Sequence, residues 1–304
     1  MGRASLKSVE LRLERALDHF EALATSINRV TGDPDTYGVV LEVDEKRRPV
    51  LRVQHVKEPS PEWEGLVSDC AHGMRSALDH LAYQLLIANT PGRVPRDRAK
   101  SSAFPIYTSG REFRERVQRG SRKGQPTSRS GLHKIRGVSD NARAIIERLQ
   151  PYHRRKNPNA RRLWELQELS NADKHRLFPL VHHAFALRHF KIVGNAPFFL
   201  GEFESVPGRI KRGAVVARWG YIAEARRMHM DVKAELITDI EFSKGRRTPY
   251  PLRGRSVIPT LHGVLRFIAD EVVPPLADEL GVPFNFKPGR LLDMREFPLP
   301  PPLP

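Results

Sequence analysis

The chain has 304 residues, of which 39% are hydrophobic and 28% are charged, so it has enough apolar side chains for a buried core and is not wholly disordered. Its single cysteine, Cys70, excludes an intramolecular disulfide and leaves a cysteine-based zinc site short of ligands. The formal net charge of +16 favours polyanionic partners.

The first predicted elements are two helices with a hairpin between them. Apolar residues recur at helical spacing over residues 6–30 and 61–89, and short alternating runs over residues 37–43 and 51–55 predict the hairpin. The charged amphipathic start lacks the apolar centre of a signal peptide, and no run approaches the ~18 apolar residues of a membrane span. We therefore expect a cytoplasmic protein that does not enter a membrane.

The middle of the chain is predicted to be a loop followed by helices and strands. Residues 92–137 are predicted to be loop-like, with a short helix around residues 112–118, and the run RGSRKGQPTSRSG has the composition of a mobile basic loop. Helices are expected over residues 139–150 and 159–176. Two strand candidates are the runs AFALRHFKIV and GAVVARWGY. Strict alternation over residues 231–242 predicts a third strand, and a last helix is expected over residues 256–280.

These elements together predict an α+β fold. We expect a mainly helical bundle of about five helices, with the early β-hairpin and a small antiparallel sheet before the C-terminal helix. Residues 1–295 are expected to form a single domain with a basic loop at about residues 93–137, and residues 296–304 to form a Pro-rich flexible tail.

Almost all of the net charge lies between Arg93 and Arg162, where 20 lysines and arginines accompany five acidic residues, an excess of +15. Such a field attracts polyanions and releases their counterions on binding. We predict a nucleic acid, RNA in particular, as the partner. Its phosphates would be contacted by Arg119, Arg122, Lys123, Arg129, Lys134, Arg136, Arg154, Arg155 and Lys156. A protein or membrane surface is the alternative partner. An Arg-rich genome composition would explain arginine in place of lysine, but not the concentration of charge in one segment.

The second helix contains the sequence HGMRSALDHLAYQ, in which Arg75 and His80 form a pair suited to RNA cleavage. A histidine can take the proton of the 2′-hydroxyl or protonate the leaving 5′-oxygen, and an arginine can stabilise charge on the phosphate. No metal is needed, because the RNA supplies its own nucleophile. Five positions at ~100° each place the two side chains ~140° apart around the helix, so a second copy across a dimer would complete the site.

This R-x4-H motif resembles the HEPN superfamily, whose ribonuclease members carry such a motif on a bundle helix and build their site at a dimer interface. The resemblance implies metal-independent cleavage by a homodimer, with Arg75 and His80 as the motif residues and Ser76 as the polar residue that follows the arginine. About residues 60–180 are also similar to a group of uncharacterised bacterial and phage proteins that share the segments RSALDHL and LWxLxxLxNxDKHR.

A later helix carries a second histidine, His175, which shares one face with Asn171 and Lys174 and is predicted to reach the phosphate. The alternatives for these residues are structural. Asp79 pairs with Arg75 one helical turn away, and cations at a helix C-terminus suit the macrodipole. A metal site between the two helices is a further alternative, although no pair has HxxxH or ExxH spacing. Its ligands would come from His72, Asp79, His80, Asp173, His175, His182 and His183.

The leading hypothesis is a metal-independent, HEPN-like endoribonuclease that acts as a homodimer without a cofactor, in a toxin or defence role. Its catalytic residues would be Arg75, Asp79, His80 and His175. The alternatives are a non-enzymatic nucleic-acid-binding protein that uses residues 93–162 and a phage or host structural protein. The sequence has no GxxxxGK[ST], GxGxxG or GxSxG motif, so nothing in it supports ATP-driven, nicotinamide or α/β-hydrolase chemistry.

Overall fold

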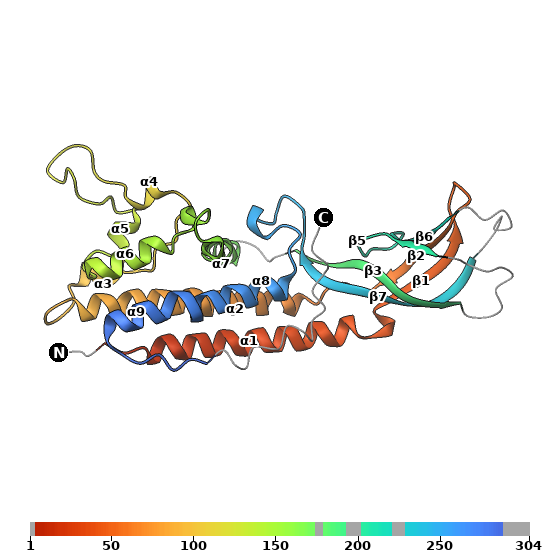
Figure 1. The fold of residues 1–304 in the computed structure, drawn as a ribbon, viewed down its shortest axis with the longest axis horizontal. Helices are drawn as coiled ribbons and strands as arrows, with labels where there is room; N and C mark the ends of the chain where they lie inside the picture. Colours follow the sequence, from red (N-terminus) through yellow and green to blue (C-terminus); the bar gives the residue numbers. More distant parts are fainter. Residues whose placement is uncertain (1–3, 174–178, 193–201, 221–228, 288–304) are drawn as a thin grey trace.

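The computed structural model describes four stretches of the chain, residues 4–173, 179–192, 202–220 and 229–287. Two regions follow one another along the long axis of the molecule, a body of helices and a curled β-sheet (Figure 1). The long strands β3 (Leu180–Ile192) and β7 (His229–Phe242) join them, since Leu180 and Phe242 at their ends are buried in the core of the helical body.

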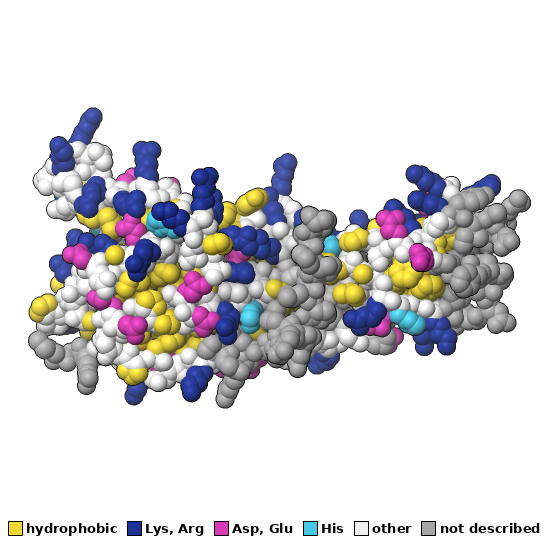
Figure 2. Space-filling model, in the orientation of Figure 1, with side chains coloured by type: hydrophobic (Ala, Val, Ile, Leu, Met, Phe, Trp, Pro, Cys, Tyr) yellow, Lys and Arg dark blue, Asp and Glu magenta, His cyan; other side chains and the backbone are white. Residues whose placement is uncertain are grey.

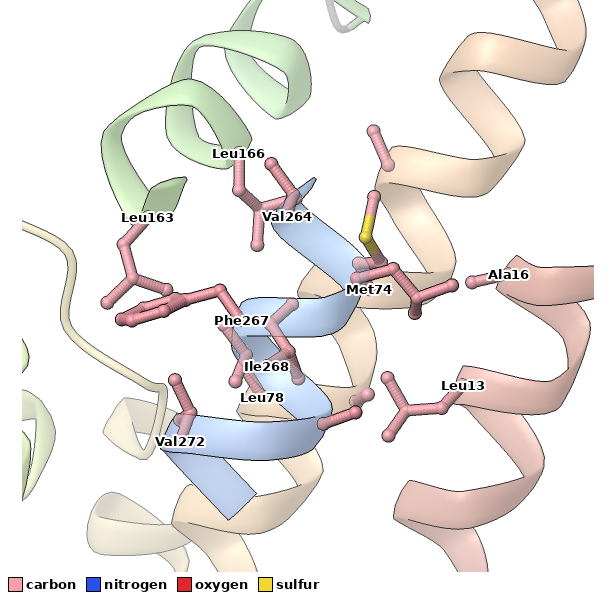
Figure 3. Packing of buried hydrophobic residues seen from close by; sticks show 14 of the residues in the cluster. Leu13, Ala16, Met74, Leu78, Leu163, Leu166, Val264, Phe267, Ile268 and Val272 are labelled. Atoms are coloured by element: carbon pink, nitrogen blue, oxygen red, sulfur yellow. The ribbon is translucent and has the colours of Figure 1, made fainter. Parts of the chain in front are cut away.

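The helical body forms around apolar stripes that meet in one core. Its longer helices are α1 (Lys7–Thr31), α2 (Pro61–Ala88), α6 (Asp140–Arg148), α7 (Arg161–Asp173), α8 (Val257–Phe267) and α9 (Val273–Leu280). Figure 3 shows side chains of α1, α2, α7 and α8 converging on this core, among them Leu13, Met74, Leu163 and Phe267. Each of these four is at most 3% exposed, and burial of a side chain of this size contributes ~1.5–3 kcal/mol.

An irregular turn lies between α8 and α9. Residues Ile268–Val272 form a π-helical turn, and one residue, Val273, separates it from Pro274 and Pro275. A proline has no N–H to donate, so carbonyl groups one turn earlier lose their usual partner and the helix widens there. The helix ends at Gly281, whose φ of 62° is a left-handed conformation that favours glycine.

The segment expected to be a basic loop is attached to α2 by short helices and buried side chains. The short helices are α3 (Arg96–Ser101), α4 (Gly110–Phe113) and α5 (Gly131–Lys134). Phe104, Phe113 and Ile135 are each at most 1% exposed and belong to the same core as the long helices. The segment lies on the side of α2 away from α1, and the stretch between α4 and α5 projects from the body (Figure 1).

Among the described residues, seven strands form one antiparallel sheet in the order β4-β6-β2-β1-β7-β3-β5. The strands besides β3 and β7 are β1 (Tyr37–Val43), β2 (Pro49–Val56), β4 (Phe203–Ser205), β5 (Gly208–Arg209) and β6 (Val215–Trp219). β4 and β5 lie at opposite edges but are separated in sequence by Val206 and Pro207 alone. The sheet therefore curls until this segment bridges its two edges.

The inside of the curl has an apolar core of its own. Tyr37 on β1 accepts a hydrogen bond at its Oη from the Leu236 N–H of β7, at 2.9 Å. The rings of Phe190, Phe203 and Trp219 contact one another at centroid distances of 5.1 to 5.9 Å. Phe190 and Phe203 are partly buried against the buried residues of this core, which are Tyr37, Val39, Leu41, Leu51, Val53, Ala184, Leu187, Ile210, Val216, Ala217, Trp219, Val232 and Leu236.

The structure is α+β, but the predicted architecture is wrong. The hairpin β1–β2 pairs with β7 on one side and β6 on the other, so it forms the centre of a seven-stranded sheet where a separate hairpin and a small sheet were expected. The described helices, α1 to α9, also exceed the expected bundle of about five. Alternation indicates that a run is a strand but does not identify its partner, and Val39 pairs with Val232, which is remote in the sequence.

Candidate nucleic-acid interface

Arg75 and Asp79 bind the backbone of the extended segment that follows α3. Arg75 Nη2 donates to Asp79 Oδ1 at 2.8 Å and to the carbonyl oxygen of Phe104 at 2.6 Å. Asp79 Oδ1 accepts from the Phe104 N–H at 2.9 Å. The pair therefore satisfies both polar backbone groups of Phe104, whose side chain is fully buried. The Arg75 side chain is only 17% exposed, so the fold itself uses this predicted catalytic residue.

His80 lies toward α1, on a different side of α2 from Arg75. Partial burial, followed by the positive charge of Arg12 on α1, lowers the pKa of His80, against a smaller opposite effect of Asp79. A neutral imidazole at pH 7 suits a general base. Within one described chain, however, Arg75 binds Phe104 while His80 lies near Arg12, so the two side chains do not converge on one phosphate.

The remaining predicted catalytic residue, His175, lies outside the described residues, as does Lys174. On the last described turn of α7, Asn171 is exposed and its side-chain oxygen accepts from Gln167 Nε2 at 2.9 Å. Among the described histidine, cysteine and carboxylate side chains, no group of three or more is placed to hold a metal ion.

Between α4 and α5 the chain folds back on itself in a basic loop, residues 115–127, which is held by its own hydrogen bonds. The Gly124 N–H donates to the carbonyl oxygen of Val117 at 2.9 Å, and the Thr127 N–H to that of Glu115 at 3.0 Å. The Thr127 hydroxyl donates to the Glu115 carboxylate at 2.7 Å. Backbone hydrogen bonds thus pair the two sides of the loop, and its acidic side chain, Glu115, is bound by the Thr127 hydroxyl.

Aromatic rings anchor this basic loop to the body. The buried ring of Phe113, at the end of α4, makes edge contacts with Tyr107 and Tyr152, each at a centroid distance of 6.0 Å. Gly131, at the start of α5, approaches Phe113 so closely that a Cβ atom would lie 2.3 Å from the ring. The Tyr107 hydroxyl donates to the carbonyl oxygen of Arg129. Both ends of the loop are therefore fixed.

The predicted phosphate-contacting residues fall into two groups. In the first group, Lys134 lies 5.0 Å from the centroid of the Tyr107 ring and Arg154 lies 5.9 Å from that of Trp164. Arg136 donates to Asp97 Oδ2 at 3.0 Å. The others are exposed and form no ion pair within the described part of the chain. We call this second group the basic ridge: Arg119, Arg122, Lys123, Arg129, Arg155 and Lys156.

The basic ridge lies along one edge of the helical body. Figure 2 shows Lys and Arg side chains gathered along the edge that carries α4, α5 and α6. Contact between Tyr152 and Phe113 joins the stretch with Arg155 to the base of the basic loop. The nearby carboxylate of Glu147 pairs with Arg114, so it does not neutralise the ridge.

A second cationic cluster, which sequence analysis missed, lies at the start of α7. Glu165 is fully buried and lies 3.2 Å from Arg161 Nε, 2.9 Å from Arg162 Nη1 and 3.8 Å from Arg255 Nε. Burial, followed by the charge of Arg161, lowers the pKa of Arg255. Helical spacing could have indicated the contacts of Arg161 and Arg162 with Glu165. Arg255 comes from the distant segment before α8, so no local pattern predicts it.

Buried titratable groups, also missed, lie where the sheet meets the body. Burial raises the pKa of Asp239 to about 6 and that of Glu241 to about 7, and it lowers the pKa of His183. His183 Nδ1 lies 3.7 Å from Glu241 Oε1, which is too long for a hydrogen bond. Both groups shift toward their neutral forms, so this contact is not a strong ion pair.

Comparison of the chain with protein-family models, with curated proteins and with solved structures finds no match. The resemblance to the HEPN superfamily therefore stays a prediction that depends on Arg75 and His80. Within the described residues, no helix combines the length and the apolar character needed to cross a bilayer.

Proposed function

We propose that this protein binds nucleic acid, and RNA in particular, through the basic ridge. The observation that carries the proposal is the placement of charge in residues 93–162. The cations of the ridge are exposed on a hydrogen-bonded loop and beside it, whereas two nearby acids, Glu147 and Glu115, are bound by Arg114 and Thr127. Exposed cations at fixed positions can neutralise phosphates and release their counterions without reorganising the fold.

Binding ranks above cleavage in this proposal because Arg75 holds the backbone of Phe104, while His80 lies toward Arg12. A ribonuclease that joins Arg75 of one copy to His80 of another stays a prediction. So do the homodimer, the toxin or defence role, the phage or host structural role and the cytoplasmic location.

The test is a triple charge reversal at the tip of the basic loop, Arg119→Glu, Arg122→Glu and Lys123→Glu. Each phosphate contact to a single strand contributes ~0.7 to the slope of log K against log salt concentration. We expect the triple variant to bind single-stranded RNA at least ~10-fold more weakly and to lower the magnitude of that slope by ~2. Fluorescence anisotropy titrations at several salt concentrations measure both the affinity and the slope.

The matched control reverses Arg209, Lys211 and Arg212, which are exposed at the sheet and form no ion pair within the described residues. It changes the net charge by the same amount but lies far from the ridge along the long axis (Figure 1). We expect its affinity and slope to stay close to those of the unaltered protein. Equal losses of affinity in both variants would show that RNA responds to net charge and not to the ridge, which would overturn the proposal. Unchanged affinity in the tip variant would also overturn it.

A further inference from the structure

The exposed ring of Tyr250 is held on a rigid turn. Its side chain is 75% exposed, and Leu11 is the other large hydrophobic residue that is exposed within the described chain. Tyr250 begins the short 3-10 helix Tyr250–Leu252, between Pro249 and Pro251, and Leu252 is fully buried. The two prolines restrict the backbone on both sides of the ring. Little conformational freedom would therefore be lost when a ligand covers it.

Behind Tyr250 lies a row of two further flat groups. The indole of Trp164 on α7 is 6.1 Å from the Tyr250 ring between centroids, with 33° between the planes. The guanidinium of Arg154 lies 5.9 Å above the Trp164 ring, an arrangement that favours cation–π attraction. The Trp164 Nε1–H donates to Glu168 at 3.2 Å, which fixes the indole. Three separate segments thus assemble the row.

Cations outnumber carboxylates beside this row, with Arg154, Arg161, Arg162 and Arg255 against Glu165 and Glu168. Arg161, Arg162 and Arg255 accompany the single buried carboxylate of Glu165, which leaves a local excess of positive charge at the start of α7. Arg154 joins the same row to the stretch that carries the end of the basic ridge. A phosphate placed here would contact cations while an attached base lies near the aromatic rings.

We propose that Tyr250, backed by Trp164 and Arg154, is a stacking site for an unpaired base of single-stranded RNA. The gap between the two rings is 6.1 Å, below the ~7 Å that a sandwiched base needs at ~3.4 Å per stacking step. The base therefore stacks on the outer face of Tyr250. In a duplex the bases already stack on each other, so this site selects single strands. The inference rests on the proposed nucleic-acid binding and adds the form of the ligand.

The test compares Tyr250→Ala, Tyr250→Phe and the control Leu11→Ala, each with a single-stranded oligoribonucleotide and with its duplex. Loss of one aromatic stacking partner lowers affinity roughly 5- to 150-fold. We expect that loss for Tyr250→Ala with the single strand alone, and near-normal binding for Tyr250→Phe and Leu11→Ala. A single strand containing 2-aminopurine should show fluorescence quenching that Tyr250→Ala removes, because quenching reports stacking.

The outcomes separate the two proposals. If the unaltered protein binds RNA with a steep salt dependence but Tyr250→Ala binds equally well, the stacking site is overturned and the binding function stands. An equal loss for single strand and duplex would also overturn a site for unpaired bases. If the unaltered protein binds neither RNA at low salt, both proposals fail together. A loss in Tyr250→Phe that matches Tyr250→Ala would assign the effect to the hydroxyl and overturn stacking.

Discussion

The helical body and the curled sheet place their ionisable side chains differently. On the body, the cations of the basic ridge are exposed, and the core beneath them is formed by apolar side chains from α1, α2, α7 and α8. At the base of the sheet, His183 and Glu241 are buried with shifted pKa values. Charge on the body is therefore available to a ligand, whereas charge at the base of the sheet acts on stability.

The largest expected effect tests whether these regions unfold together. Leu78 on α2 and Leu41 on β1 are both fully buried, one in each core. We expect Leu78→Ala and Leu41→Ala each to lower the free energy of unfolding by ~2–5 kcal/mol in a single transition, since β3 and β7 extend into both cores. Urea unfolding followed by circular dichroism and by tryptophan fluorescence provides the measurement. An early, separate transition in Leu41→Ala alone would show that the sheet unfolds independently.

A smaller effect is expected where a charged pair serves the fold of the body. Arg75→Ala leaves the Phe104 carbonyl without its side-chain donor and Asp79 without its cationic partner, so we expect a loss of ~2–3 kcal/mol in the free energy of unfolding. His80→Ala removes a partly exposed ring and should lower it by less than ~1 kcal/mol. Urea titration of both variants is the measurement. Equal losses would contradict the structural role assigned to Arg75.

The same two variants test the ribonuclease hypothesis. If Arg75 and His80 act in catalysis, each substitution should slow single-turnover cleavage of a labelled RNA by ~10²-fold, with cleavage by the unaltered protein persisting in EDTA. The control is Arg148→Ala with His153→Ala, a second R-x4-H pair that Pro151 interrupts. Cleavage by His80→Ala at the rate of the unaltered protein would end the hypothesis.

The smallest effect concerns the buried carboxyl group of Glu241. Its pKa of about 7 lies above the ordinary value of 4.5, so between these values the folded state binds a proton that the unfolded state has lost. Stability from this group is therefore present at low pH and is lost as the pH rises through about 7. Glu241→Gln does not titrate, and we expect it to be more stable than the unaltered protein by roughly 2 kcal/mol at pH 8.

Thermal or urea unfolding from pH 4.5 to pH 8 measures this difference, which should shrink toward the acid end. The lowered pKa of His183 acts in the opposite sense, since stability falls as the pH drops through the ordinary histidine value of 6.5. That effect is largely common to both proteins. Asp231→Asn, at an exposed position of the same strand that forms no ion pair within the described residues, is the control, and its stability difference from the unaltered protein should stay constant with pH. A stability difference between Glu241→Gln and the unaltered protein that does not change with pH would refute the raised pKa of Glu241.

The sequence indicated the long helices well because their apolar spacing is local. The expected helices over residues 6–30 and 61–89 match α1 (Lys7–Thr31) and α2 (Pro61–Ala88) within one residue at each end. The sheet order could not be predicted in this way, because β1 pairs with β7 across most of the chain. β3 also begins at Leu180, four residues before the expected start at Ala184. Its first residues include His182 and His183, which are buried although they are polar, so an apolar pattern does not indicate this part of the strand.

In the candidate site, too, local features could be predicted from the sequence, whereas contacts between distant segments could not. The concentration of cations in residues 93–162 can be read directly from the sequence. The contact between Arg75 and Asp79 was one of the alternatives that their spacing of one helical turn predicted. Their shared partner, the backbone of Phe104, lies in a segment without periodicity, so only the fold reveals it. Tyr250 meets Trp164 for a similar reason: the turn Tyr250–Leu252 carries no regular pattern.

The segment that bridges the two edges of the sheet bears on how copies of the protein meet. The edge strands β4 and β5 have three and two residues. Val206, between them, donates to the carbonyl oxygen of Val216, and Ile210, directly after β5, donates to that of His182, both at 2.9 Å. A strand from another molecule would find only a few backbone groups to pair with at these edges. The curl therefore protects this region from edge-to-edge polymerisation, because a strand of another copy finds no long open edge to extend.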